Sequence, residues 1–203
     1  MSDDVERLRV ELRDRYAIEE QIGSGGMADV YRALDIKHGR PVAIKILRRE
    51  IGGAMGADRF AREIEIAARL QHPNILPVYD SGDSGGTLFY TMPYVTEGSL
   101  RTRLAELHTI PLAGAMEIVR EVADALAFAH RCHIVHRDIK PENILFLADH
   151  AVVADFGIAR AIESLSHERL TLAGYGIGTP EYMSPEQAFG EADIDGRSDI
   201  YSL

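Results

Sequence analysis

Residues 133–157 constrain the fold of this chain more than any other stretch. Short apolar runs at 144–147 and 151–154 have the length of buried strands, and polar residues separate them. The polar residues therefore fall in turns beside the strands, where folding brings them into one small volume. They are Asp138, Lys140 and Asn143 before the first run, and Asp155 after the second.

These side chains suit a phosphoryl group and a hard cation. Asn143 and Asp155 offer oxygen ligands for a metal. Asp138 offers a proton acceptor, and Lys140 offers a positive charge for phosphate. Two ordinary polar loops between strands would explain the polarity, but not this particular combination of residue types.

The same stretch resembles two loops of the protein kinase family. His136-Arg137-Asp138, followed by Lys140 and Asn143, is similar to the kinase catalytic loop, and Asp155-Phe156-Gly157 is similar to the magnesium-binding loop. Lys140, two residues after Asp138, resembles the serine/threonine class rather than the tyrosine kinases.

Composition excludes several other classes. The chain has 203 residues, 46% of them hydrophobic and 27% charged, which is ample for a core. Its net charge of -10 argues against a nucleic-acid partner. A single cysteine, Cys132, rules out an internal disulfide framework, and we expect it to be buried. The eight histidines show no metal-ligand spacing.

No stretch approaches the ~18 apolar residues of a membrane span, and the N-terminus is too charged for a signal peptide. The sequence thus predicts a cytoplasmic chain without membrane contact of its own. Any membrane anchor of a longer protein would lie outside these residues.

The N-terminal part predicts an antiparallel meander. Strands are expected at residues 16–22, 27–35 and 41–47, after a short amphipathic lead-in at 3–15. A glycine-rich turn joins the first two strands and lets the backbone approach a ligand closely, although an ordinary hairpin would also use glycines. It resembles the kinase loop over the ATP phosphates, with Ala28 in place of the third glycine. The residues that the resemblance assigns to ATP here are Ile22, Gly23, Ser24, Gly25, Gly26, Val30 and Ala43.

Lys45 and Glu63 are expected to form an ion pair. In the resemblance, Lys45 is the lysine that positions the ATP phosphates. The helix predicted at residues 57–70 places Glu63 among apolar positions, where a carboxylate needs a partner. The alternative is that Glu63 lies at the edge of the apolar stripe and reaches water.

Strands are expected at residues 75–79 and 87–92, followed by a segment that resembles the kinase hinge. Met92 would be the gatekeeper beside adenine. Helices are predicted at 100–107 and 111–132, the second with an apolar face of Ala115, Ile118, Val119, Val122, Leu126 and Ala129. The resemblance adds Pro93, Tyr94, Val95 and Leu145 to the residues that contact the nucleotide.

Residues 155–186 resemble a kinase activation segment. Thr179 is similar to the threonine that contacts the catalytic aspartate and lysine, and Ser184 replaces the alanine of the family's Ala-Pro-Glu motif. Thr171 is the expected activating phosphorylation site. Asp199 resembles the aspartate that opens the central helix of the large lobe and anchors the catalytic loop.

The resemblance implies an α+β, two-lobed protein-kinase fold. Residues 1–15 would be a lead-in, and 16–92 an antiparallel β-sheet small lobe with one helix. Residues 93–203 would form the hinge and a mostly helical large lobe that is incomplete at Leu203, so that the chain alone would be loosely packed.

The predicted function is ATP-dependent phosphorylation of protein serine and threonine hydroxyls, with autophosphorylation of the activation segment through self-association. The predicted catalytic residues are Lys45, Glu63, Asp138, Lys140 and Thr179; Asn143 and Asp155 would bind Mg²⁺, with Mn²⁺ as an alternative. Two rivals remain: a nucleotide-binding regulatory fragment with impaired catalysis, and a small-molecule kinase of the aminoglycoside-phosphotransferase type. The latter would not need the peptide-positioning segment at residues 178–186.

Overall fold

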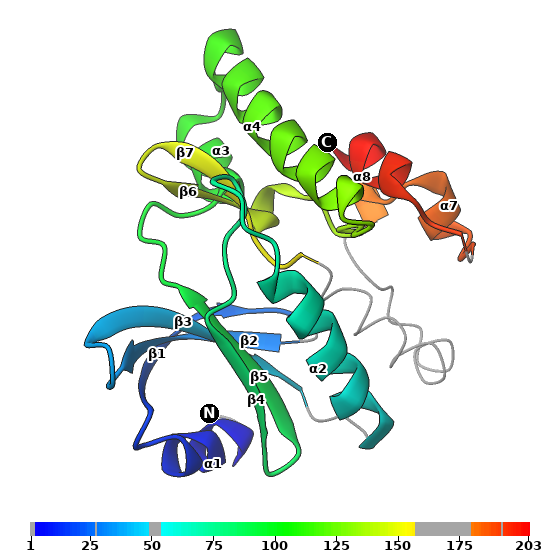
Figure 1. Cartoon of the computed structure of the whole chain (residues 1–203). Coiled ribbons are helices and arrows are strands. Elements are labelled where there is room, and N and C mark those ends of the chain that lie inside the picture. The colour runs from blue at the N-terminus through cyan, green and yellow to red at the C-terminus, as the bar shows by residue number, and fades with distance from the viewer. Residues whose placement is uncertain (1–2, 27, 49–53, 157–179, 192) are drawn as a thin grey trace.

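The computed structural model describes residues 3–26, 28–48, 54–156, 180–191 and 193–203. A five-stranded antiparallel sheet with two helices forms one part, and a mostly helical part with a short hairpin forms the other (Figure 1). Helix α1 lies at the end of the molecule away from α4 and α8. The α+β architecture expected from the sequence is confirmed.

The sheet has the strand order β1-β2-β3-β5-β4. Residues 75–79, predicted as a strand, are not one: Ile75 forms a single bridge to Val153, and the strand begins only at Asp80. The apolar residues of that segment thus pack where the sheet meets the helical part, and they do not add a strand to the sheet. The strands are β1 (Tyr16–Ser24), β2 (Ala28–Asp35), β3 (Arg40–Leu47), β4 (Asp80–Ser84) and β5 (Thr87–Pro93).

Side-chain alternation divides the sheet into two buried faces. On the outer face, Ile44 of β3 and Phe89 of β5 pack with apolar side chains of α1 (Asp3–Glu11). Three apolar residues of the lead-in are buried there, so the amphipathic helix predicted for it is confirmed. These residues are Val5, Leu8 and Leu12.

The inner face of the sheet packs against α2 (Ala54–Ala68). Ala43 and Leu47 of β3 lie on this face with Tyr90 and Met92 of β5. Lys45 lies between Ala43 and Leu47 in the strand, so the period of two directs its side chain to the same face. The fold therefore places an ammonium group inside an otherwise apolar layer.

The helical part is built on two helices and a hairpin. Ser99 caps α3 (Leu100–Leu107) by accepting from the backbone N–H of Thr102, and α3 has the bounds predicted from the sequence. The remaining elements are α4 (Leu112–Arg131), the 3-10 turn η2 (Pro141–Asn143), β6 (Ile144–Leu147), β7 (His150–Val153), the 3-10 turn η3 (Pro180–Tyr182), α7 (Pro185–Ala188) and α8 (Gly196–Ser202).

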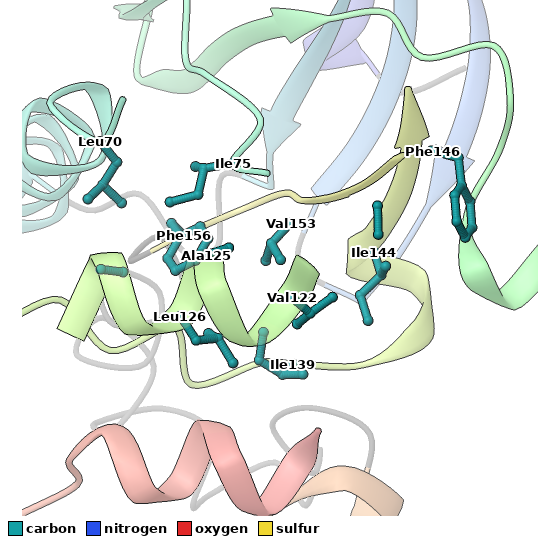
Figure 2. Packing of buried hydrophobic residues seen from close by; sticks show 12 residues of the cluster. Leu70, Ile75, Val122, Ala125, Leu126, Ile139, Ile144, Phe146, Val153 and Phe156 are labelled. Carbon is teal, nitrogen blue, oxygen red and sulfur yellow. The ribbon is translucent and has the colours of Figure 1, made fainter. Parts of the chain in front are cut away.

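A second core lies between α4 and the β6–β7 hairpin. Figure 2 shows Val122 and Ala125 of α4 in one cluster with Val153 and Phe156, and Leu126 directed toward Ile139. Leu70 and Ile75 join this cluster from the sheet side, so it links the two parts of the molecule.

Two predicted burials on α4 are wrong. Val119 is 46% exposed, because the first half of α4 extends beyond the hairpin (Figure 1). Cys132 is exposed because the helix ends at Arg131, and His133, with φ of 61°, then turns the chain away from the buried face. No helix in the described ranges has the length and apolar character needed to cross a membrane.

Candidate functional site

The β6–β7 hairpin aligns the two polar loops found in the sequence. Ile144 pairs with Val153 at the end of the hairpin, and the backbone N–H of Ala154 donates to the carbonyl of Asn143 at 2.9 Å. Asp155 is the next residue along the chain. The predicted metal ligands Asn143 and Asp155 are therefore brought to the same end of one hairpin.

Asp138 is fixed by two of the predicted partners. The Lys140 ammonium donates to both carboxylate oxygens of Asp138, at 2.9 and 2.8 Å. The Asn143 amide donates to the backbone carbonyl of Asp138 at 2.7 Å and to its carboxylate at 3.0 Å. About a third of the Asp138 side chain remains exposed (34%). The carboxylate is thus oriented and still partly open to solvent.

Asp199 of α8 anchors the loop that precedes Asp138. Its buried carboxylate accepts the backbone N–H of His136 at 2.9 Å and that of Arg137 at 2.8 Å. The ring of His130 adds a third contact at 2.7 Å. Arg137 has a φ of 70°, a strained value for a residue with a side chain, and these bonds keep it in that conformation.

His136 connects the loop to the start of the second polar segment. Its Nδ1 accepts from the backbone N–H of Asp138 at 3.2 Å, so its Nε2 carries the proton and donates to the carbonyl of Ala154 at 2.8 Å. The His136 ring meets the Phe156 ring edge to face, with centroids 4.7 Å apart. Asp155, between Ala154 and Phe156, is thereby positioned from both sides.

Lys45 pairs with Asp155 across the two parts of the molecule. Nζ of Lys45 donates to Oδ2 of Asp155 at 2.6 Å, and both side chains are mostly buried. The hydroxyl of Tyr90 donates to Oδ1 of the same carboxylate. Burial raises the pKa of the Asp155 carboxyl, but the Lys45 ammonium and these hydrogen bonds outweigh it and leave the pKa below its usual value.

The expected ion pair between Lys45 and Glu63 is absent from the described residues. The Lys45 ammonium forms its ion pair with Asp155 instead. The Glu63 side chain is half-buried and remains accessible to solvent. The alternative, in which Glu63 lies at the edge of the apolar stripe, describes this structure. A catalytic role of Glu63 stays a prediction.

Most residues predicted to contact adenine share one apolar cluster on the inner face. Ile22, in contrast, is 42% exposed and lies outside the cluster. The strand pairing sets Ala43 opposite Met92, and Tyr94 lies against the guanidinium of Arg32. The predicted residues in the cluster are Val30, Ala43, Met92, Val95 and Leu145.

The glycine-rich turn is tied back to β2. The Ser24 hydroxyl donates to the Asp29 carboxylate at 2.6 Å, and the N–H of Gly25 donates to the carbonyl of Ala28 at 2.9 Å. A side chain at Gly26 would meet no atom within 4 Å, so the space beside that position is open. The contacts of Gly23, Ser24 and Gly25 with phosphate stay predictions.

Two residues contribute to the site without having been predicted from the sequence. Tyr90 lies two residues before Met92 in a strand, and the period of two alone would have placed both on the same face. Gln187 of α7 donates from its side-chain amide to the carbonyl of Arg137 at 2.6 Å. Its position after Ser184 forms a capping box, which is a recognisable sequence signal. Thr171 and Thr179 lie outside the described residues.

The donor atoms suit a metal shared with a phosphate group. The described ranges contain no cluster of three or more His, Cys, Asp or Glu side chains that could hold an ion without another ligand. Asn143 uses its NH₂ group toward Asp138, which leaves its side-chain oxygen for a cation. That oxygen and the Asp155 carboxylate are the hard ligands that Mg²⁺ takes together with substrate phosphates and water.

Known proteins give a consistent match. The family described as protein kinase domain matches residues 16–203. Serine/threonine-protein kinase PknB of Mycobacterium leprae is 45% identical over 198 residues, which covers 95% of this chain and 31% of PknB. Serine/threonine-protein kinase PknL of Mycobacterium tuberculosis is 41% identical over 194 residues, covering 95% and 48%. The chain thus spans less than half the length of either relative.

A solved structure agrees with the sequence matches. The crystal structure of the M. tuberculosis PknI kinase domain superposes with a TM-score of 0.74 at 32% identity. The match covers 92% of this chain and 68% of that domain.

Proposed function

Because this chain belongs to the protein kinase domain family and resembles its bacterial serine/threonine kinases, we propose that it transfers the γ-phosphoryl group of ATP to serine and threonine hydroxyls of proteins. The observation that carries the proposal is the arrangement of Asp138, Lys140 and Asn143 beside the Lys45–Asp155 pair. These are the groups that phosphoryl transfer requires.

Asp138 orients the substrate hydroxyl and accepts its proton at a carboxylate oxygen. Lys140 and Asn143 fix the carboxylate for this role. Lys140 can also neutralise charge on the transferred group, a role supported by the contact of its ammonium with the Asp138 carboxylate. Phosphoryl transfer needs little covalent chemistry from the protein, so placement of these groups accounts for most of the catalysis.

Lys45 positions the nucleotide phosphates, and the inner-face cluster with the hinge residues Pro93, Tyr94 and Val95 receives adenine. A divalent cation, when bound by Asn143 and Asp155, neutralises charge on the phosphates. Mg²⁺ fits the oxygen ligands, and Mn²⁺ is the alternative. Because ATP is the phosphoryl donor, the chain would work on the cytoplasmic side of a membrane.

Regulation would act through the activation segment. We include in the proposal that two copies of the chain phosphorylate one another at this segment. Arg137, directly before Asp138, is the residue that the family resemblance pairs with a phosphate there.

One observation favours a second candidate, a nucleotide-binding regulatory module with impaired transfer. Lys45 pairs with Asp155, and no Lys45–Glu63 pair is present in the described part of the chain. A chain confined to this arrangement would bind ATP without positioning it for transfer.

A phosphotransfer assay with radiolabelled ATP separates the two candidates. The proposal expects transfer to protein hydroxyls that falls by about 10²–10⁴ in Asp138→Asn, the usual contribution of a positioned base, while ATP affinity is kept. Asp149→Asn is the matched control, because Asp149 lies in the exposed β6–β7 turn and asparagine also tolerates its φ of 64°. Saturable ATP binding with no transfer in the unmodified chain would favour the regulatory module.

A further inference from the structure

Tyr90 occupies a place in the site that the function proposed above does not use. It lies directly opposite Lys45 in the β3–β5 pairing, and its side chain is 1% exposed. Its ring packs in the inner-face cluster, with the Phe60 ring centroid 6.3 Å away. Its hydroxyl lies at the edge of this apolar layer and donates a hydrogen bond to Oδ1 of Asp155.

The Asp155 carboxylate consequently has a hydrogen-bond donor on each oxygen. Oδ2 receives the Lys45 ammonium and Oδ1 receives the Tyr90 hydroxyl. A divalent cation binds a carboxylate through the same lone pairs that accept hydrogen bonds. Lys45 can follow the phosphates of an incoming nucleotide. Tyr90, in contrast, is a rigid side chain in an interior strand, and its hydroxyl has no such alternative partner in the described residues.

We infer that Tyr90 is a positioning residue whose hydroxyl competes with the divalent cation for Asp155, so that it raises the cation concentration needed to fill the site. This inference rests on the proposed metal role of Asp155. Its physical basis is that a cation must displace or share a hydrogen bond made in a buried setting, where such bonds are stronger than in water. The phenol keeps the carboxylate oriented while no cation is bound.

Tyr90→Phe tests this directly, because it removes the hydroxyl and leaves the ring in its packing. Mn²⁺ binding is measured by electron paramagnetic resonance, with a non-hydrolysable ATP analogue at saturation. The variant is expected to bind Mn²⁺ about tenfold more tightly, the factor equivalent to ~1.4 kcal/mol and to one typical hydrogen bond. Affinity for the nucleotide analogue without metal should be unchanged.

Tyr31→Phe is the matched control. Tyr31 is 3% exposed and belongs to the same sheet, but it lies in the outer-face cluster with α1. If the Tyr90 hydroxyl acts on stability alone, Tyr90→Phe should change the unfolding temperature and leave the affinity for Mn²⁺ as it is in Tyr31→Phe. Unchanged or weaker Mn²⁺ binding in Tyr90→Phe overturns the inference.

Asp155→Asn separates this inference from the proposed function. Wild-type Mn²⁺ binding that disappears in Asp155→Asn supports the metal role of Asp155, whatever Tyr90→Phe does. If Asp155→Asn binds Mn²⁺ as tightly as the wild type does, the proposed metal site is wrong. The inferred role of Tyr90 is then wrong as well.

Discussion

The backbone N–H of Arg137 donates to the buried carboxylate of Asp199 at 2.8 Å, although the two residues are 62 positions apart in the sequence. The second oxygen of that carboxylate accepts from His136 and meets the ring of His130. One side chain of α8 therefore sets the backbone from which Asp138 projects.

Asp199→Asn should disrupt this anchor. An amide offers one oxygen instead of two and turns its NH₂ group toward a backbone N–H, leaving a buried donor unsatisfied. We expect a loss of about 2–4 kcal/mol in unfolding free energy, measured in urea, from the polar groups left unpaired. Turnover should fall while the KM for ATP changes little, since the adenine residues lie elsewhere.

Asp195→Asn is the control for that variant. Asp195 caps the same helix by accepting from the N–H of Arg197, and asparagine caps equally well. Equal stability of the two variants would contradict the anchoring role of Asp199.

Lys45→Met should destabilise the chain as well as stop phosphoryl transfer. It leaves the Asp155 carboxylate buried with the Tyr90 hydroxyl as its remaining donor. Breaking a buried ion pair costs about 3–5 kcal/mol, and we expect a loss near the lower end because that donor stays. Urea unfolding measures the loss, and Lys37→Met in the exposed β2–β3 turn is the control.

A double-mutant cycle isolates the pair. If Lys45 acts on stability through Asp155, then Lys45→Met should cost much less in a chain that already carries Asp155→Asn. Additive losses would show that the two side chains stabilise the fold independently.

The pair of His150 and Glu121 predicts a pH-dependent stability. The hydrogen bond and charge of Glu121 raise the pKa of His150, which lies 2.6 Å from its carboxylate. A raised folded-state pKa gives a stabilisation that is complete below the unfolded value of about 6.5 and is lost as the pH rises through the folded value. Unfolding free energies in urea, taken from pH 6 upward, should show this decrease.

His150→Gln should remove that decrease, so the difference between wild type and variant should shrink as the pH rises. His108→Gln is the control, because the His108 ring forms no ion pair in the described part of the chain and meets a backbone carbonyl of α3 instead. Parallel pH profiles for wild type and His150→Gln would disprove the assignment. The Glu121 carboxylate keeps its second bond from the N–H of Ala151 in either case.

Thr171 is the expected site of activating phosphorylation. A phosphate there adds about −1.5 to −2 charges and can form charge-assisted bonds with arginine. Phosphopeptide mapping after incubation with ATP should find Thr171 modified, and Thr171→Ala should lower activity. Full activity with only Ser164 or Ser166 modified would contradict this assignment.

Much of the fold could be predicted because local patterns agree with tertiary packing. In β3, α2 and α4, the buried face carries the apolar residues. Their spacing in the sequence therefore identifies both the type of element and its buried face. Residues 75–79 were misassigned because an irregular segment between two cores can carry the same alternation as a strand.

The partner of Lys45 could not be predicted in the same way. Both Glu63 and Asp155 satisfy the need for a carboxylate, and the choice depends on how two distant segments pack. The role of Tyr90 could not be predicted because an apolar strand pattern does not show which group a tyrosine hydroxyl contacts. Its hydroxyl has a role only once the Asp155 loop is placed beneath the strand.

Helix α1 has a practical consequence for anyone who isolates this protein. The family match begins at residue 16, yet Val5, Leu8 and Leu12 fill the outer face of the sheet. The helix is also bonded to two strands, from Arg9 to the carbonyl of Glu19 at 2.7 Å and from Ser84 to Glu11. A recombinant form that begins at residue 16 would lose the apolar side chains that cover the outer face of the sheet. The physical unit of folding is thus longer than residues 16–203, the range that the family model matches.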